Sequence, residues 1–285
     1  MRISEENNVQ RIRYILILVI SLLGWFSLGG MLTLLLRRFT FFKETKAGIF
    51  ILTFVPHIVL FLSLEFLARY VLRKKLADLV GKKSIKAFLT AFLITLIVYS
   101  IAEIFSLESI VYNSTDGWEE KILFLLLSAF LLLPQTFAEE VIFRILPERI
   151  LSPEDRKLGR TRKIFLALFC GFFFVLPHLL NTEITSSSNP VIPIITYFLW
   201  GFSASFLGTH IQTYVPIWAM HYANNFFSVV IVSAEKTTLR GAPIFYNMAG
   251  EYSPILIIKT LLLFLAVFLC HSNDRKRKDK DSFLD

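Results

Sequence analysis

The chain has 285 residues, of which 55% are hydrophobic and 18% are charged, and its mean hydropathy is +0.61. So small a charged fraction argues against a soluble domain of this size and is typical of a membrane protein. The net charge of +8 would suit a nucleic-acid partner, but the basic residues form short clusters between apolar runs. That arrangement is typical of membrane-topology signals, so we expect no nucleic-acid partner.

Eight apolar stretches follow one another along the chain, each near the roughly 20 residues that a helix needs to cross a bilayer. They lie at about 14–36, 47–72, 87–106, 122–148, 164–180, 191–209, 215–234 and 254–270. The first lacks a small-residue cleavage site and is too long for a signal-peptide core, so we interpret it as a retained span. The sequence therefore predicts an all-α, polytopic membrane protein with about eight transmembrane helices that enclose an intramembrane site.

The predicted domain organisation is simple. A short segment, 1–13, precedes one transmembrane domain, 14–270, and a basic tail, 271–285, follows it and is expected to be disordered. Between the spans, 20 Lys and Arg residues lie on the side of both termini and 7 lie on the other side. Cytoplasmic loops carry an excess of Lys and Arg, so we expect a multi-pass protein of the cell membrane with both termini in the cytoplasm.

The fourth span contains the sequence FAEEVIFRIL, with three charged residues in an apolar setting. A charge in the middle of a bilayer costs at least ~2.5–3.5 kcal/mol and tends to mark function or a buried pair. Glu140 and Arg144 stand four residues apart and are expected to pair, whereas Glu139 points about 100° away and is expected to have no local partner. A pair would be enough for helix packing, so the additional carboxylate of Glu139 indicates function.

Polar residues with helical spacing also occur in two later spans. Phe174 and His178 share a face in GFFFVLPHLLN, and His221 and Asn225 share a face in IWAMHYANNFF. With Glu139 they supply a carboxylate, two imidazoles and an amide. These groups are suited to activating water as a general base and to stabilising an oxyanion.

Other polar residues in the spans receive a structural interpretation. His57 and His210 are expected to form hydrogen bonds between packed helices, which is the commoner role of a lone histidine in a membrane. Glu103 and Lys259 are expected to lie near the membrane interfaces or to pair within the bundle.

The three polar sites resemble the motifs of a known family. EEVIFR at 139–144 fits EExxxR, FVLPH at 174–178 fits FxxxH, and HYANN at 221–225 fits HxxxN. In this order, and each in a separate predicted span, they resemble the CAAX protease and bacteriocin-processing family of intramembrane proteases, also called the Abi family. The resemblance covers roughly residues 122–230. Ile145 departs from it, because family members often carry glycine at this position.

The resemblance implies roles for individual residues. Glu139 and His178 would activate the attacking water, while His221 and Asn225 would stabilise the oxyanion of the tetrahedral intermediate. Supporting roles are implied for three further residues, Glu140, Arg144 and Phe174.

The resemblance also implies a biochemical function. The chain would be an intramembrane endopeptidase, a hydrolase that cleaves a hydrophobic or membrane-associated peptide near the cytoplasmic side. The alternative is a non-proteolytic membrane partner, such as a bacteriocin-immunity or sensor-kinase-modulating protein, because the family also includes such roles. The bilayer lipid and the peptide substrate are the expected partners.

We expect no metal cofactor at this site. Members of the resembled family are often labelled metalloproteases, and two histidines with a glutamate could bind zinc. Asn225 and an Arg-paired Glu140 are nevertheless poor zinc ligands, and neither Cys170 nor Cys270 shows metal-ligand spacing.

Other intramembrane protease chemistries fit the sequence badly. The chain has no HExxH motif and no aspartate in a predicted span, and GFSAS at 201–205 misses the rhomboid GxSG pattern at its last residue.

Overall fold

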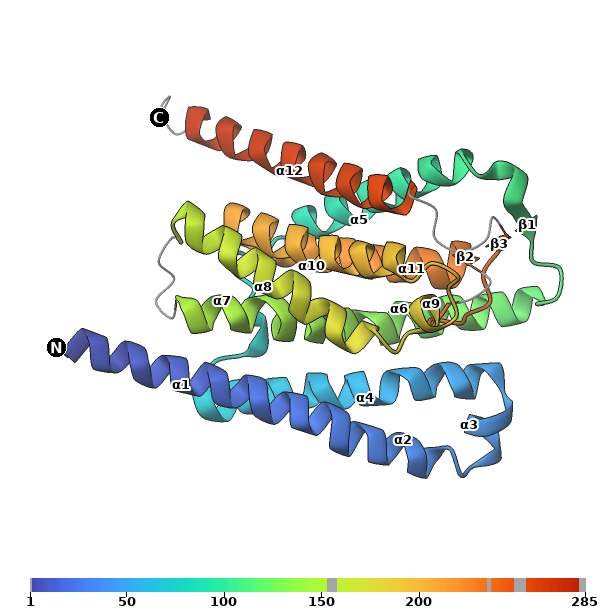
Figure 1. Cartoon of the computed structure of the whole chain (residues 1–285), viewed down its shortest axis with the longest axis horizontal. Helices are drawn as coiled ribbons and strands as arrows, with labels where there is room; N and C mark the ends of the chain where they lie inside the picture. Colours follow the sequence, from blue (N-terminus) through green and yellow to red (C-terminus); the bar gives the residue numbers. More distant parts are fainter. Residues whose placement is uncertain (1, 153–157, 235–236, 249–254, 282–285) are drawn as a thin grey trace.

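A computed structural model of the chain is a bundle of long helices that run side by side (Figure 1). It describes residues 2–152, 158–234, 237–248 and 255–281. The first and last described residues lie at the same end of the bundle, which we call the terminal end. Helix α9 and three short strands lie at the opposite end, which we call the strand end.

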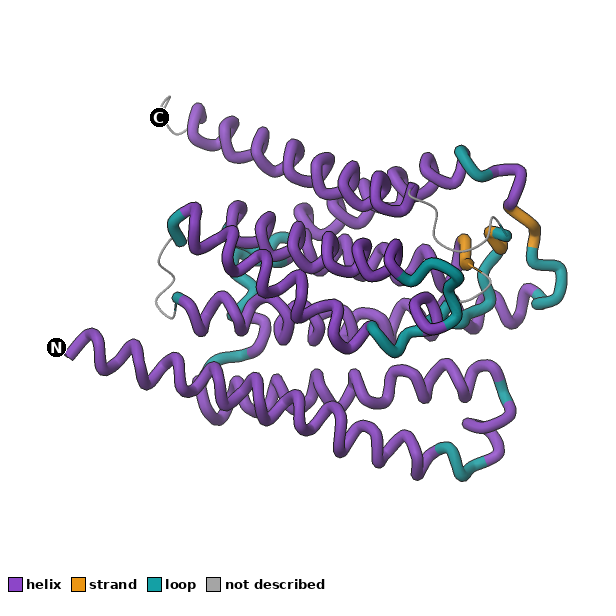
Figure 2. The backbone as a smooth tube through the Cα atoms, viewed as in Figure 1, coloured by secondary structure: helices purple, strands orange, loops and turns teal. Residues whose placement is uncertain are grey.

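Helices make up most of the described chain (Figure 2). They are α1 (Arg2–Leu23), α2 (Gly30–Leu36), α3 (Thr40–Glu44), α4 (Lys46–Leu67), α5 (Ile85–Ile104), α6 (Trp118–Glu140), α7 (Leu146–Leu151), α8 (Arg160–His178), α9 (Thr182–Thr185), α10 (Val191–Ile211), α11 (Val215–Phe226) and α12 (Ile255–Asp281). Wider π-helical turns extend or join several of them, at Gly24–Gly29, Ala68–Leu72, Val141–Ile145 and Phe227–Ile231.

The prediction of an all-α, polytopic membrane protein is confirmed. Six described helical segments are long and apolar enough to cross a bilayer: Glu5–Leu36, Lys46–Leu72, Ile85–Ile104, Trp118–Leu151, Arg160–His178 and Val191–Ile211. Of the last two predicted spans, the segment Leu256–Cys270 of α12 is a shorter apolar helix, and the other corresponds to α11 with its π-helical turn. Helix α12 continues to Asp281, into the tail for which the sequence predicts disorder.

The outer surface of the bundle is strongly apolar. Large apolar side chains on the helices and in the turn after α5 point outward, with exposed fractions of 67% for Leu34, 77% for Phe105 and 74% for Phe130. Apolar side chains exposed all around a protein mark contact with something other than water. Together with the length of the helices, this surface implies a lipid bilayer as the environment.

Close helix contacts position the side chains of the interior. Helices α8 and α10 cross at Gly171 and Gly201. A Cβ atom on Gly201 would lie 2.8 Å from the carbonyl oxygen of Cys170 and 2.8 Å from Cβ of Phe174, so only glycine permits this approach. Small residues at helix crossings are typical of membrane bundles. The crossing holds Phe174 against the middle of the bundle.

Three short strands close the strand end. They are β1 (Ile110–Tyr112), β2 (Val232–Ala234) and β3 (Phe245–Asn247). Their order is β1-β3-β2, with β3 antiparallel to β1 and parallel to β2. The strands were not predicted, because three residues are too few to show an alternating pattern. They tie the loop after α5 to two segments of the connection between α11 and α12.

Candidate active site

The two adjacent glutamates end helix α6, directly before the π-helical turn Val141–Ile145. The side chains are buried: Glu139 is 3% exposed, and both Glu140 and Arg144 are 0% exposed. Single π-helical turns inside α-helices are frequent at functional sites. Here the turn carries Arg144 and follows the glutamates without a break in the helix.

Glu140 is the centre of a buried ionic cluster. Its Oε1 accepts hydrogen bonds from Nη1 of Arg144 at 2.8 Å and from Nδ1 of His221 at 2.7 Å. The predicted pair between Glu140 and Arg144 is therefore confirmed. The guanidinium of Arg144 also lies 4.4 Å from the ring centroid of Phe174, within range of a cation–π interaction. Glu140 thus joins α6 to α11 and fixes the orientation of the His221 ring.

Glu139 presents its two oxygens to different surroundings. Oε1 accepts a hydrogen bond from Nε2 of Gln135 at 2.5 Å and lies 3.1 Å from Nε2 of His57. Among the described residues Oε2 has no hydrogen-bond partner, and it lies 3.6 Å from Nε2 of His221. The expectation that Glu139 has no local partner is wrong, because Gln135 lies one helical turn earlier. One oxygen of this carboxylate is held, and the other is free.

His178 is also held through one ring nitrogen. Its Nδ1 donates to the backbone carbonyl oxygen of Phe174 at 2.6 Å, because a carbonyl oxygen can only accept. The ring packs between Phe174 and Tyr197, with centroid distances of 4.3 Å to each. Because Nδ1 is engaged in this hydrogen bond, Nε2 is the ring nitrogen that can exchange a proton.

Asn225 takes part in a chain of hydrogen bonds that ends at Glu139. Tyr99 Oη donates to Oδ1 of Asn224 at 2.6 Å, and Nδ2 of Asn224 donates to Oδ1 of Asn225 at 2.9 Å. Asn225 Nδ2 then donates to Oε1 of Gln135 at 3.2 Å, and Gln135 donates to Glu139. The amide predicted to bind an oxyanion is therefore already oriented by its neighbours.

A cavity of about 1440 Å³ brings most of these residues together. Five of the seven residues proposed from the sequence line it: Glu139, Phe174, His178, His221 and Asn225. The other two, Glu140 and Arg144, are buried behind it. Four lining residues to which the sequence gave no catalytic role contact the cluster directly or through neighbours: His57, Tyr99, Gln135 and Asn224.

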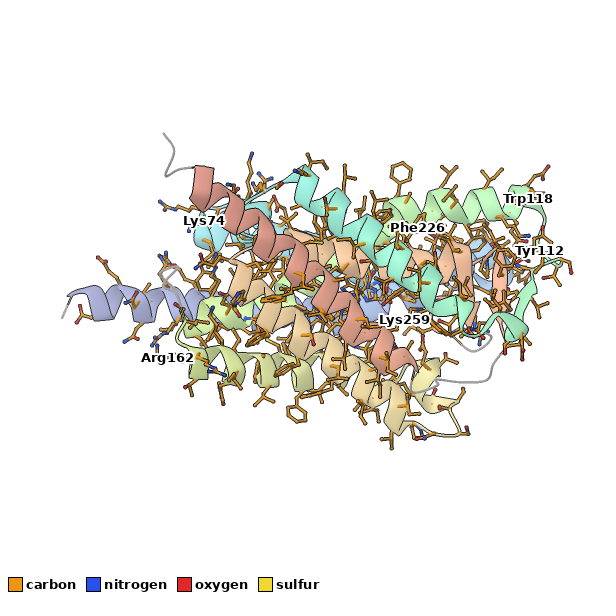
Figure 3. All side chains as sticks on the ribbon, turned by 90° about the horizontal axis from the view of Figure 1, so that it is seen from above. Lys74, Tyr112, Trp118, Arg162, Phe226 and Lys259 are labelled. Atoms are coloured by element: carbon orange, nitrogen blue, oxygen red, sulfur yellow. The ribbon has the colours of Figure 1, made fainter. Side chains whose placement is uncertain are left out.

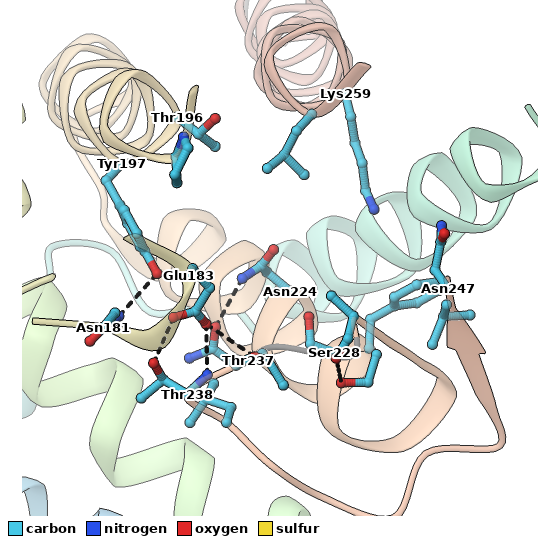
Figure 4. A pocket seen from close by; sticks show the side chains of 18 of the residues that line it. Asn181, Glu183, Thr196, Tyr197, Asn224, Ser228, Thr237, Thr238, Asn247 and Lys259 are labelled. Carbon is cyan, nitrogen blue, oxygen red and sulfur yellow. Dashed lines mark hydrogen bonds between the residues drawn. The ribbon is translucent and has the colours of Figure 1, made fainter. Parts of the chain in front are cut away.

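Polar side chains line the part of the cavity that reaches the strand end, which we call its mouth (Figure 4). On one wall the carboxylate of Glu183 accepts hydrogen bonds from Thr237 Oγ1 at 3.0 Å and from Thr238 Oγ1 at 2.6 Å. On the other wall Nζ of Lys259 lies 3.0 Å from Glu103 Oε1, so the predicted pairing of these two residues within the bundle is confirmed. Nδ2 of Asn247 donates to the second oxygen of Glu103 at 2.7 Å. Polar and charged side chains therefore line this part of the cavity.

The mouth lies at the strand end, away from both termini. Its described lining comes from α5 and the loop after it, from the α9 region and from the beginning of α12. For a substrate that enters here, the expectation of cytoplasmic termini and the expectation of cleavage near the cytoplasmic side are incompatible. If both termini are cytoplasmic, the mouth faces the other side of the membrane, and cleavage is not near the cytoplasmic side.

Residues 119–227 match the family model described as Type II CAAX prenyl endopeptidase Rce1-like. The predicted resemblance to CAAX proteases is confirmed. No curated protein and no solved structure matched the chain. The family suggests intramembrane protease activity, and the matched residues include all three motifs and the ionic cluster of Glu140.

His57 lies outside the segment that matches the CAAX protease model, and the sequence assigned it only a hydrogen bond between packed helices. On α4 it contacts Glu139, and its ring centroid lies 5.3 Å from that of Trp25. The only signal in the sequence is a histidine in the middle of the second apolar span. That signal does not say which neighbouring helix the ring faces.

The donor set does not fit a zinc ion. Among the described residues no three His, Cys, Asp or Glu side chains form a group that could hold a metal. Glu140 already accepts from Arg144 and His221, and Oε1 of Glu139 accepts from Gln135. We therefore derive no catalytic step through a metal.

That the site binds no metal remains a prediction, which can be tested directly. Elemental analysis of the protein purified in detergent should find no stoichiometric zinc. One zinc per chain that disappears together with activity in His178→Ala would contradict this prediction and would require a metalloprotease mechanism.

Proposed function

We propose that the protein is an intramembrane endopeptidase in which Glu139 activates water for the hydrolysis of a hydrophobic or membrane-associated peptide. The observation that carries the proposal is Oε2 of Glu139, which has no hydrogen-bond partner among the described residues and is buried beside His221 in a cavity with a polar mouth. A held carboxylate with one unpartnered oxygen is suited to take a proton from water. The family match supports the same reaction class.

In this mechanism Oε2 of Glu139 takes a proton while the water oxygen forms a bond to the carbonyl carbon of the peptide. His178 shares the water through Nε2, the nitrogen that Phe174 leaves available. The carbonyl oxygen becomes an oxyanion, which His221 and Asn225 stabilise. The proton held by Glu139 then passes to the peptide nitrogen as the C–N bond breaks. The products are a carboxylic acid and an amine.

For His221 to donate to the oxyanion, Nε2 must carry a proton in addition to the one that Nδ1 shares with Glu140. The carboxylate of Glu140 keeps the ring in place for this role. It acts in the way that a carboxylate orients the histidine of a serine protease, without contacting the substrate.

The proposed activity can be tested by comparing the membrane peptides of cells that express the wild type and Glu139→Gln. A peptide that accumulates uncut in the variant, with its fragments present only in the wild type, would support the protease. A phenotype of the wild type that Glu139→Gln retains in full, with no difference between the peptides, would favour the non-proteolytic partner.

A further inference from the structure

The direction of the cavity defines the side from which a substrate reaches Glu139. The lining extends to segments 102–109, 181–188 and 237–239, all of which lie at the strand end. None of the described residues 73–84 or 212–214, which form loops at the terminal end, lines it. A peptide therefore enters the cavity from the strand end.

The charges of the chain distinguish the two ends of the bundle. The spans predicted from the sequence put 20 Lys and Arg residues on the side of the two termini and 7 on the other side. Figure 3 shows Lys74 and Arg162 at the terminal end, with Tyr112 and Trp118 at the opposite end. One of the seven, Lys46, is neutralised by an ion pair with Asp116. An excess of Lys and Arg marks the cytoplasmic side.

We propose that the cavity opens on the extracytoplasmic side and admits membrane-anchored peptides whose cleavage site is exposed there. This substrate class rests on the proposed protease function. It replaces the expectation of cleavage near the cytoplasmic side. The polar mouth suits a peptide that arrives from water, because Ser186, Thr237 and Thr238 line it and the charge of Lys259 is balanced by Glu103.

Cysteine labelling tests the orientation without requiring turnover. Ser186→Cys would place a thiol at the mouth, and Thr161→Cys would place one on the exposed face of α8 at the terminal end. Both variants also carry Cys270→Ser, which removes the exposed native thiol, whereas Cys170 is buried. A membrane-impermeant maleimide should label Ser186→Cys in intact cells and Thr161→Cys only after permeabilisation. The reverse pattern would overturn the proposal.

A second experiment, on peptide hydrolysis, tests the substrate class. A membrane-impermeant library of quenched fluorescent peptides should be hydrolysed by intact cells with the wild type and not by cells with Glu139→Gln. Hydrolysis only after permeabilisation would overturn the proposed substrate side. If the purified wild type in detergent hydrolysed none of the peptides while the labelling pattern held, the protease function would be contradicted and the orientation of the cavity supported.

A separate contact points to a positioning residue for the same reaction. His57 Nδ1 donates to the backbone carbonyl oxygen of Thr53 at 3.1 Å, so Nε2 is the nitrogen that faces Glu139. We infer that His57 acts with Gln135 to hold Oε1, which leaves Oε2 for the water.

Variants of His57 test this inference, which also rests on the proposed function. His57→Leu should lower kcat about 10- to 100-fold and leave KM within a few-fold, because a misplaced carboxylate slows the reaction without changing substrate contacts. His57→Gln, which retains a donor, should recover most of the loss. His210→Leu, away from the cavity, is the matched control.

Two results would overturn the role of His57. One is an unchanged kcat in His57→Leu. The other is an equal loss in His57→Leu and His57→Gln that follows a lower melting temperature, because that pattern reports packing alone. Absence of activity in the wild type would contradict the protease function instead.

Discussion

Glu139→Gln is expected to leave the protein inserted and folded while lowering peptide hydrolysis about 10²- to 10⁴-fold, the range for loss of a general base. The fold should survive because the glutamine keeps a carbonyl oxygen that can accept from Gln135. Its amide nitrogen would replace Oε2, the oxygen without a partner among the described residues. An amide cannot take a proton from water, so turnover should fall without a change in stability.

The measurement pairs a peptide-cleavage assay with thermal unfolding in detergent. Glu44→Gln makes the same chemical change at an exposed position outside the cavity and should match the wild type in both assays. If Glu139→Gln retained wild-type turnover, a different base would have to be found. If it lost turnover only in proportion to lost folded protein, a structural role would replace the catalytic one.

Glu140→Gln is expected to lower the stability of the folded protein and to reduce turnover as well. The change removes the charge that pairs with Arg144 and orients His221, and all three side chains are at most 5% exposed. Removal of one partner of a buried ion pair costs about 3–5 kcal/mol, because the other charge remains without compensation. The free energy of unfolding should therefore fall by about that amount.

The control for this prediction is an ion pair with the same spacing and greater exposure. Glu65 and Arg69 are also four residues apart, and their side chains are 25% and 55% exposed. Glu65→Gln should cost at most about 1 kcal/mol. The double variant Glu140→Gln, Arg144→Gln should recover part of the stability, because it no longer leaves a charge alone.

Thermal unfolding in detergent measures all three variants. Equal losses in Glu140→Gln and Glu65→Gln would contradict the buried ionic cluster. If Glu139→Gln proved unstable while Glu140→Gln stayed folded and inactive, the roles of the two glutamates would have to be exchanged.

The membrane fold and the ionic pair could be predicted from the sequence because both depend on short stretches of chain. Hydropathy over about 20 residues predicts a span, and a spacing of four residues predicts that Glu140 faces Arg144. Each of the three family motifs also lies within a short stretch of consecutive residues. The seventh span was harder to predict from hydropathy, because α11 is short and continues only through a π-helical turn before β2 begins.

The surroundings of Glu139 could not be read from helix spacing alone. The sequence shows that this glutamate points away from Arg144, but not which groups it meets across the bundle. His57 reaches it from α4, outside the family match, and His221 reaches both glutamates from α11. Packing of helices far apart in the sequence decides which oxygen of the carboxylate is held and which is free.

The sequence by itself determined that the chain spans a membrane, which loops carry the positive charge and which residue types are available for the proposed chemistry. These properties follow from hydropathy, loop charge and spacing along one helix. Only the tertiary structure decided that Gln135 and His57 flank one oxygen of Glu139 and that the cavity opens at the strand end. Both depend on how separate helices pack and where their loops meet, and no pattern within a single span contains that information.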